Sequence, residues 1–384
     1  MVMVNKPNWV PKNAGKEFTT SVLKGVGNIH DGLSKKNRLT NTNIIRRKSL
    51  SIDDYVNGVL SGNRTIIART ITLIESNSPK HFELSQKVLK KLLPFSGNSI
   101  RIGITGVPGA GKSTFIEALG NKLIKENHKI AVLAVDPTSS ITKGSVLGDK
   151  TRMEVLSRNE NCFIRPSPSA GKLGGVTRKT RETIVVCEAA GFDIILVETV
   201  GVGQNEITVR SLVDYFLLLK IAGAGDELQG IKKGVIELAD ALVINKADGD
   251  NVTRAEIARQ EFSRALHYLK SPTEGWNPQV FKTSATQNEG IDEVWENIML
   301  FKDTVQKNNF FYIRRNKQLI AWVHTLIKEN LYNQFYRNDD IIKHIPMIEN
   351  KVLEGKIPPT FAAQKLLEIY KNIIHSNKGI TNEI

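Results

Sequence analysis

The chain has 384 residues, of which 40% are hydrophobic and 24% are charged, and its formal net charge is +14. Such a composition is ordinary for a globular protein with a real core, and it argues against wholesale disorder. The longest apolar runs are far shorter than the roughly 20 residues of a membrane-spanning helix, so no membrane partner is expected. The basic residues are spread out rather than gathered in one stripe with aromatic residues, so no nucleic-acid partner is expected either.

Residues 1–48 carry a local excess of positive charge. They hold many Lys and Arg but only two acids, Glu17 and Asp31, and they are rich in Ser, Thr and Asn. They lack the apolar core of a secretory signal, so the pattern is typical of a mitochondrial transit peptide, with a basic disordered arm as the alternative. The sequence therefore predicts a location in the mitochondrial matrix, and the alternative is the cytoplasm.

Residues 49–98 are expected to form a helical segment, because apolar residues recur there at spacings of three and four. The clearest of these are Ile66, Ile67, Ile71, Leu73 and Ile74. Pro94 and Gly97 then break the pattern. The run 100–105 that follows is predicted to be a short buried strand.

Residues 99–308 are expected to form an α/β domain of the P-loop NTPase type. After the first strand, apolar and β-branched runs alternate with helical stretches. These runs are 130–135, 194–197, 215–221, 241–244 and 280–281. This alternation predicts a mainly parallel sheet flanked by helices, with ligands bound at the carboxyl ends of the strands.

Residues 309–384 are expected to form a C-terminal helical extension, because the strand signal fades beyond residue 291. Apolar residues here stand at helix-compatible spacings: Trp295, Ile298, Leu319, Trp322, Val323, Leu326 and Leu331. Pro358 and Pro359 separate a last helix around 361–374. The apolar faces could pack on the sheet domain or form a subunit interface, and periodicity does not decide between the two.

A glycine-rich loop follows the first predicted strand and precedes a helix. Its residues are Gly106, Val107, Pro108, Gly109, Ala110, Gly111, Lys112 and Ser113, followed by Thr114. This is the P-loop pattern, in which backbone N–H groups turn toward phosphate oxygens at a helix N-terminus. Lys112 is predicted to reach the β- and γ-phosphates, and Ser113 to offer its hydroxyl to Mg²⁺.

A second motif predicts that the bound base is guanine. Asn245, Lys246 and Asp248 close a later strand, and the Asp248 carboxylate can accept from the ring N1–H and the exocyclic amine of guanine. Adenine offers an acceptor at N1 and would be rejected. A further loop follows the next strand and could meet the guanine O6 with its backbone. Its candidate residues are Ser284, Ala285 and Thr286.

Acidic residues near predicted strand ends are candidates for the metal. Asp136, Asp149 and Glu198 lie between the two motifs, and Mg²⁺ prefers hard oxygen ligands together with retained waters. One or two of these carboxylates are expected to act directly or through water. Together with Lys112 they form the predicted catalytic set, and Gly201 could give its N–H to the γ-phosphate.

The span from about Asn63 to Asn308 resembles the methylmalonyl-CoA mutase-associated GTPases, which include the methylmalonic aciduria type A protein and bacterial relatives once labelled as arginine/ornithine transport kinases. The resemblance rests on the P-loop, on the Asn245 motif and on four further segments. These are 69–76 (RTITLIES), 136–140 (DPTSS), 198–204 (ETVGVGQ) and 222–234 (AGAGDELQGIKKG).

The resemblance implies a GTPase that serves an adenosylcobalamin-dependent methylmalonyl-CoA mutase, gating delivery of the cofactor and protecting or reactivating the enzyme. It also implies that Asp136, Asp149 and Glu198 are metal and switch acids. Gln229 and Lys232 would lie in a further mobile switch segment. A homodimer formed through the C-terminal extension is implied as well.

Two other classes of function remain to be weighed. A metallochaperone NTPase shares this kind of P-loop domain, but it should show a His-rich tract or a Cys-His pair near the nucleotide, and neither is visible. A small-molecule kinase or transport ATPase is disfavoured because the Asn245–Asp248 motif suits guanine rather than adenine.

Overall fold

The computed structural model describes residues 50–136, 153–168, 173–199, 206–223 and 233–380. The helices and strands given below lie in one compact unit, Ser51–Ile384. The N-terminal segment predicted to be a transit peptide lies outside the described residues. The boundaries proposed at residues 48, 98 and 308 stay predictions.

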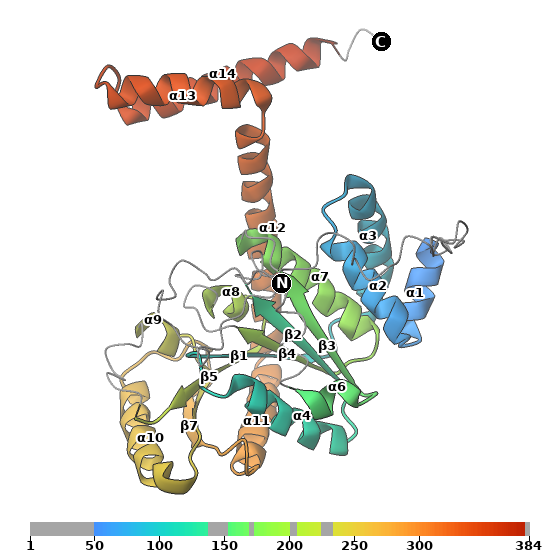
Figure 1. The fold of residues 1–384 in the computed structure, drawn as a ribbon, viewed down its shortest axis with the longest axis vertical. Helices are drawn as coiled ribbons and strands as arrows, with labels where there is room; N and C mark the ends of the chain where they lie inside the picture. The colour runs from blue at the N-terminus through green and yellow to red at the C-terminus, as the bar shows by residue number, and fades with distance from the viewer. Residues whose placement is uncertain (1–49, 137–152, 169–172, 200–205, 224–232, 381–384) are drawn as a thin grey trace, which may run out of the picture. The chain divides into compact units, whose positions relative to one another are not determined.

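Within the described residues, a seven-stranded sheet forms the centre of this unit (Figure 1). Its strands are β1 (Ile100–Gly106), β2 (Ile130–Asp136), β3 (Cys162–Pro168), β4 (Ile194–Thr199), β5 (Tyr215–Ile221), β6 (Ala241–Asn245) and β7 (Gln279–Lys282). They lie in the order β3-β2-β4-β1-β5-β6-β7, and every neighbouring pair is parallel. The predicted α/β fold with a parallel sheet is therefore confirmed, and the carboxyl ends of all strands lie at one edge.

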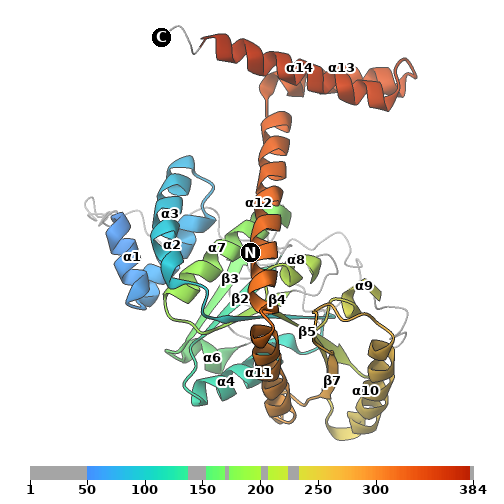
Figure 2. The same cartoon turned by 180° about the vertical axis from the view of Figure 1, so that it is seen from behind.

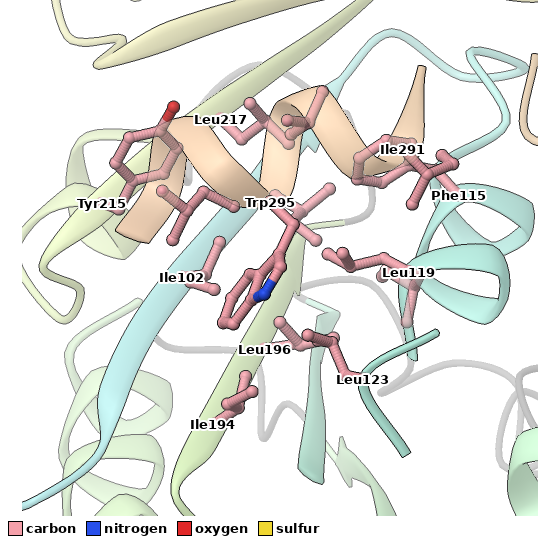
Figure 3. Close-up of a cluster of buried hydrophobic side chains, with 14 of the residues drawn as sticks. Ile102, Phe115, Leu119, Leu123, Ile194, Leu196, Tyr215, Leu217, Ile291 and Trp295 are labelled. Carbon is pink, nitrogen blue, oxygen red and sulfur yellow. The ribbon is translucent and has the colours of Figure 1, made fainter. Parts of the chain in front are cut away.

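Helices α4 (Lys112–Lys125) and α11 (Ile291–Lys307) cover one face of this sheet. Figure 3 shows the cluster that joins them to the strands, in which Phe115 of α4 and Trp295 of α11 pack with Ile102 of β1. Buried apolar residues at these helical and strand spacings explain why the elements form where they do. Burial of such large side chains stabilises this face by about 1.5–3 kcal/mol each.

The opposite face carries α7 (Leu173–Ala189) and α8 (Glu206–Arg210). Alternate residues of β1 point to this side, and a side chain at Gly103 would come within 3.0 Å of Val209 in α8. Arg101 of the same strand forms a 2.8 Å ion pair with the buried Glu188 of α7. Close packing at Gly103 and this ion pair fix both helices against the strand.

The other elements between strands are short, apart from one helix beside β6 and β7. They are α6 (Glu154–Arg158), α9 (Lys233–Ile236), η3 (Gly249–Asn251) and α10 (Val252–His267). α10 is tied to β7 by a 2.5 Å ion pair between Glu256 and Lys282. Hydrogen bonds from Arg259, Lys282 and Gln260 lower the pKa of Glu256 to about 2.

Within the described residues, three helices precede the sheet, where the sequence predicts a helical segment. They are α1 (Ile52–Leu60), α2 (Arg64–Glu75) and α3 (Pro79–Leu92), followed by η2 (Leu93–Phe95). α1 begins with a capping box in which Ser51 and Asp54 exchange hydrogen bonds with each other's backbone N–H. Asn63 caps α2 by accepting from two backbone N–H groups. These caps satisfy donors that the first helical turn leaves unpaired.

One strand, β3, was not predicted from the sequence. This segment contains Arg165, Pro166 and Pro168, so it lacks the unbroken apolar run that marks the other strands. Among the described strands, β3 lies at the edge of the sheet and pairs with β2 alone. Proline is tolerated in an edge strand because one side of the strand needs no hydrogen-bond donor.

The C-terminal helices confirm the predicted helical extension. They are α12 (Phe310–Tyr336), α13 (Asp339–Leu353) and α14 (Pro359–Ile380), and they follow α11. Of the two possibilities predicted for the apolar residues after residue 291, packing on the sheet domain holds for α11, and the subunit interface stays a prediction. Trp295 and Ile298 of α11 are buried against the sheet, whereas Leu319 and Leu331 of α12 are 56% and 58% exposed. No helix in the described ranges is both long and apolar enough to cross a membrane.

Arg315 anchors the start of α12 to the sheet domain. Its guanidinium donates to Asp214 Oδ1 at 2.8 Å, to Gly97 O at 2.6 Å and to Ser99 O at 2.7 Å. It also lies 4.2 Å from the centroid of the Phe311 ring. A buried, fully hydrogen-bonded arginine of this kind fixes the helix where it leaves the domain.

Candidate nucleotide-binding site

The glycine-rich loop lies between the carboxyl end of β1 and the N-terminus of α4. Gly106 has φ +154°, and a Cβ there would lie 2.4 Å from the carbonyl oxygen of Leu219. Gly111 has φ +83°, and a Cβ there would lie 2.6 Å from Asn245 Nδ2. Both positions therefore need glycine, for backbone conformation and for space. The strand–loop–helix context required of a P-loop is present.

Lys112 is the first residue of α4, and its side chain is held inside the loop. Its ammonium group donates to Gly106 O at 2.9 Å and to Val107 O at 3.2 Å. Lys112 is buried, whereas Val107, Pro108 and Gly109 are exposed. The amine is thus fixed beneath a solvent-facing loop, where it can meet an anion that the loop encloses.

Ser113, in the first turn of α4, contacts Glu198 of β4. The Ser113 hydroxyl donates to Glu198 Oε1 at 3.0 Å, and Glu198 is 8% exposed. Glu198 sits near the end of β4, in register with Ile104 of β1. Two neighbouring ligands of an octahedral Mg²⁺ with bonds of about 2.1 Å would be about 3 Å apart, so this pair of oxygens fits that ion.

Thr105 also belongs to the site, although it was not predicted from the sequence. Its buried hydroxyl lies 2.8 Å from the hydroxyl of Thr199, in the strand next to it. The pair joins the residue before the P-loop to the residue after Glu198. A polar residue directly before the P-loop is the sequence signal that could have found Thr105.

Asn245 connects the P-loop to the two loops predicted to bind the base. Its Nδ2 donates to Ala110 O at 2.8 Å, while its Oδ1 accepts from Thr283 Oγ1 at 3.0 Å and from Ala285 N at 3.3 Å. The residue is buried, so these bonds satisfy its amide away from water. One side chain therefore sets the spacing among three loops.

Asp248 is held by the loop that follows β7. Ser284 Oγ donates to Asp248 Oδ2, and Thr286 Oγ1 donates to the same oxygen at 3.2 Å. In the part of the chain that the structure describes, no group donates to the other oxygen, Oδ1. The carboxylate is half-buried, so it is oriented yet still accessible.

The structure brings together most of the predicted site residues that it describes. The P-loop, Glu198, Asn245, Asp248, Ser284 and Ala285 are joined by the contacts above, and Thr114, Lys246 and Thr286 are exposed around them. Asp136 ends β2, and its side chain is outside the described residues. Four further predicted residues also lie outside them: Asp149, Gly201, Gln229 and Lys232.

Comparison with known proteins gives consistent matches. The family model described as "Methylmalonyl Co-A mutase-associated GTPase MeaB" matches residues 67–340. A probable GTPase of Mycobacterium tuberculosis is 48% identical over 319 residues, covering 83% of this chain and 95% of the relative. GTPase ArgK of Escherichia coli is 44% identical over 318 residues, covering 83% and 96%.

A mammalian relative and a solved structure match over a similar length. The mitochondrial methylmalonic aciduria type A homolog of Mus musculus is 44% identical over 331 residues, covering 84% of this chain and 80% of the relative. A crystal structure described as a LAO/AO transport system kinase has a TM-score of 0.69 and 38% identity. It covers 84% of this chain and 100% of its own.

Proposed function

Because the chain belongs to the family of methylmalonyl-CoA mutase-associated GTPases, we propose that it is a Mg²⁺-dependent GTPase that acts as a chaperone of adenosylcobalamin-dependent methylmalonyl-CoA mutase. In this role it gates delivery of the cofactor and protects or reactivates the mutase. The observation that carries the nucleotide part is Asn245, whose hydrogen bonds tie the phosphate-binding loop to both base-binding loops.

The phosphates of GTP would lie over the P-loop, at the N-terminus of α4. Backbone N–H groups of residues 107–114 would donate to the phosphate oxygens, and Lys112 would pair with the β- and γ-phosphates. Its present acceptors, two loop carbonyls, keep the amine within the loop before any phosphate binds. Binding then needs little reorganisation of the lysine, which lowers the entropy cost.

Ser113, Glu198, Asp136 and Asp149 are proposed to hold Mg²⁺, directly or through water. The 3.0 Å contact between Ser113 and Glu198 supports the first two. The ion supplies positive charge that stabilises the phosphoryl group during transfer to water. Glu198 is fixed by its buried place near the end of β4, and Gly201, three residues later, is proposed to donate its N–H to the γ-phosphate.

Asp248 is proposed to select guanine. Ser284 and Thr286 occupy its Oδ2, which leaves Oδ1 for the N1–H and amine of the base. The backbone of Ser284, Ala285 and Thr286 would meet the guanine O6, and Lys246 would flank the base plane. Adenine would place its N1 acceptor against the carboxylate and would leave both groups unsatisfied.

We expect Asp248→Ala to weaken GTP binding by at least about tenfold, because a buried hydrogen bond to a charged group is worth about 1.5–3 kcal/mol. Asp250→Ala removes an exposed acid from the same loop and is the matched control. Titration of both variants and the wild type with GTP and with ATP provides the measurement. Equal GTP affinities for Asp248→Ala and the wild type would show that Asp248 does not bind the base.

A homodimer is proposed as the working assembly, formed through the C-terminal helices. The exposed apolar side chains of α12 support it. They include Leu319, Ile320, Val323, Ile327, Leu331 and Tyr332, each at least 49% exposed. An apolar helix face of this length is typical of a surface that another subunit covers.

The mitochondrial matrix is proposed as the location, and the cytoplasm is the alternative. The basic composition of residues 1–48, with many Asn and Thr and only two acids, supports the matrix. The relative from Mus musculus is named mitochondrial, whereas the other two relatives described above come from bacteria.

Gln229 and Lys232 are proposed to act in a switch segment that responds to the mutase. Because a partner that prefers one nucleotide-dependent conformation must alter hydrolysis, we expect Gln229→Ala and Lys232→Ala to lose mutase-stimulated GTP hydrolysis while keeping basal activity. Steady-state phosphate release with and without the mutase measures both rates. Unaltered stimulation in both variants would contradict the switch assignment.

A further inference from the structure

A cavity of about 850 Å³ lies between α7, α8, the loop 272–274 and the first half of α12. In Figure 2, the first half of α12 lies between α7 and α8. None of the residues that line the cavity belongs to the P-loop or to the base-binding loops. Its volume falls within the roughly 300–1,000 Å³ typical of small-molecule sites.

The lining of this cavity is strongly basic. Among the described residues, it is lined by one acid, Glu274, and by four cations, which are Arg181, Arg210, Arg314 and Lys317. Beneath them, the buried carboxylate of Asp240 accepts from Arg210 Nη2 at 3.1 Å, and its Oδ2 lies 3.9 Å from Arg314 Nη2. One carboxylate therefore pairs with two guanidinium groups, so the cavity has a net positive charge.

Arg181 and Lys317 form no ion pair with any acid that the structure describes. Arg181 Nη2 donates to Ser211 O at 2.5 Å, but its buried Nε has no hydrogen-bond partner within the described residues. Burial, together with the nearby charge of Arg101, lowers the pKa of Arg181 to about 10. An anion placed in the cavity would offset this unfavourable burial of positive charge.

Apolar groups line the same cavity beside these cations. The Trp322 ring lies 5.3 Å from the Arg181 guanidinium, which covers one part of it. Ile207 and Ile313 also line the cavity, yet they are 74% and 44% exposed. A flat apolar body between Trp322 and Ile207 would remove this surface from water and would stabilise the complex.

We propose that the cavity binds a small organic anion with a flat apolar body. Its carboxylate, sulfonate or phosphate group lies next to Arg314 and Lys317, and its apolar body packs against Trp322 and Ile207. Arg314 donates to Thr273 Oγ1 at 2.9 Å and is held in place for this contact. Arginine suits planar anions, while the exposed Lys317 adds attraction at the rim.

The test uses 8-anilinonaphthalene-1-sulfonate, an aromatic sulfonate whose fluorescence rises in apolar sites. Lys317→Glu and Ile207→Ser change exposed residues of the cavity and should leave the fold intact. Each is expected to weaken the probe's binding to the full chain by about fivefold or more. Lys328→Glu on the same helix and Ile257→Ser on α10 are the matched controls, and they should bind like the wild type.

The uncharged analogue N-phenyl-1-naphthylamine separates anion recognition from apolar contact. It should bind more weakly than the sulfonate, and it should respond to Ile207→Ser but not to Lys317→Glu. Wild-type affinity of the sulfonate for both cavity variants would overturn the proposal. Equal binding of the charged and uncharged probes, or equal losses in the control variants, would overturn it too.

Discussion

Replacing Lys112 by Ala is expected to lower GTP hydrolysis by about a hundredfold or more, because loss of one preorganised donor to a developing charge costs about 10²–10³ in rate. The buried ammonium is held by Gly106 O and Val107 O, and we propose that it pairs with the β- and γ-phosphates there. Phosphate release under saturating GTP measures the effect. Lys125→Ala, an exposed change at the far end of α4, should keep full activity.

Lys112 also supports the loop itself, so its effect on stability must be measured separately. Thermal unfolding without nucleotide measures how much Lys112 contributes to the stability of the fold. A second variant, Lys112→Arg, keeps the positive charge while changing its position. We expect both Lys112 variants to fold and Lys112→Ala to lose activity. Full hydrolysis by a folded Lys112→Ala would contradict the assignment of this lysine to the phosphates.

Glu198→Ala is expected to lower Mg²⁺-dependent turnover by about a hundredfold, with a smaller change in nucleotide affinity. Glu198 is buried near the end of β4 and accepts a hydrogen bond from Ser113. Its loss therefore removes one predicted Mg²⁺ ligand and takes away the acceptor that orients the other, Ser113. Turnover measured against Mg²⁺ concentration should show a higher requirement for the ion. An unchanged dependence of turnover on Mg²⁺ would show that Glu198 does not bind the ion.

Glu198→Gln is the control for shape. The glutamine keeps an oxygen that can accept from Ser113, but it removes the negative charge. If the charge holds the ion, this variant should behave like Glu198→Ala in the Mg²⁺ titration. Wild-type behaviour of Glu198→Gln, alongside a defective alanine variant, would assign Glu198 a packing role instead.

The sequence predicted the sheet and the phosphate loop well, because both leave local signals. Continuous apolar runs mark strands buried on both faces, and Gly106, Gly111 and Lys112 stand at a fixed spacing set by phosphate geometry. β3 escaped because its edge position permits prolines and a charged Arg165. Edge strands carry weaker patterns because only one side must pair.

The rest of the site depends on contacts between distant segments, which periodicity does not encode. The bridge from Asn245 to Ala110 joins residues 135 positions apart, and Thr105 meets Thr199 across 94 positions. The exposure of Leu319 on α12, against the burial of Trp295 on α11, likewise depends on which helix reaches the sheet. Both helices show the same spacing of apolar residues in the sequence.

The proposed function predicts that the wild-type chain hydrolyses GTP in preference to ATP. Phosphate release is measured for each nucleotide at equal concentration, with Mg²⁺ and with the ion chelated. We expect Mg²⁺-dependent release from GTP at least about tenfold faster than from ATP, because Asp248 is proposed to pair with guanine and to repel the adenine N1. Equal release from the two nucleotides, or no Mg²⁺-dependent release from GTP, would contradict the proposed function.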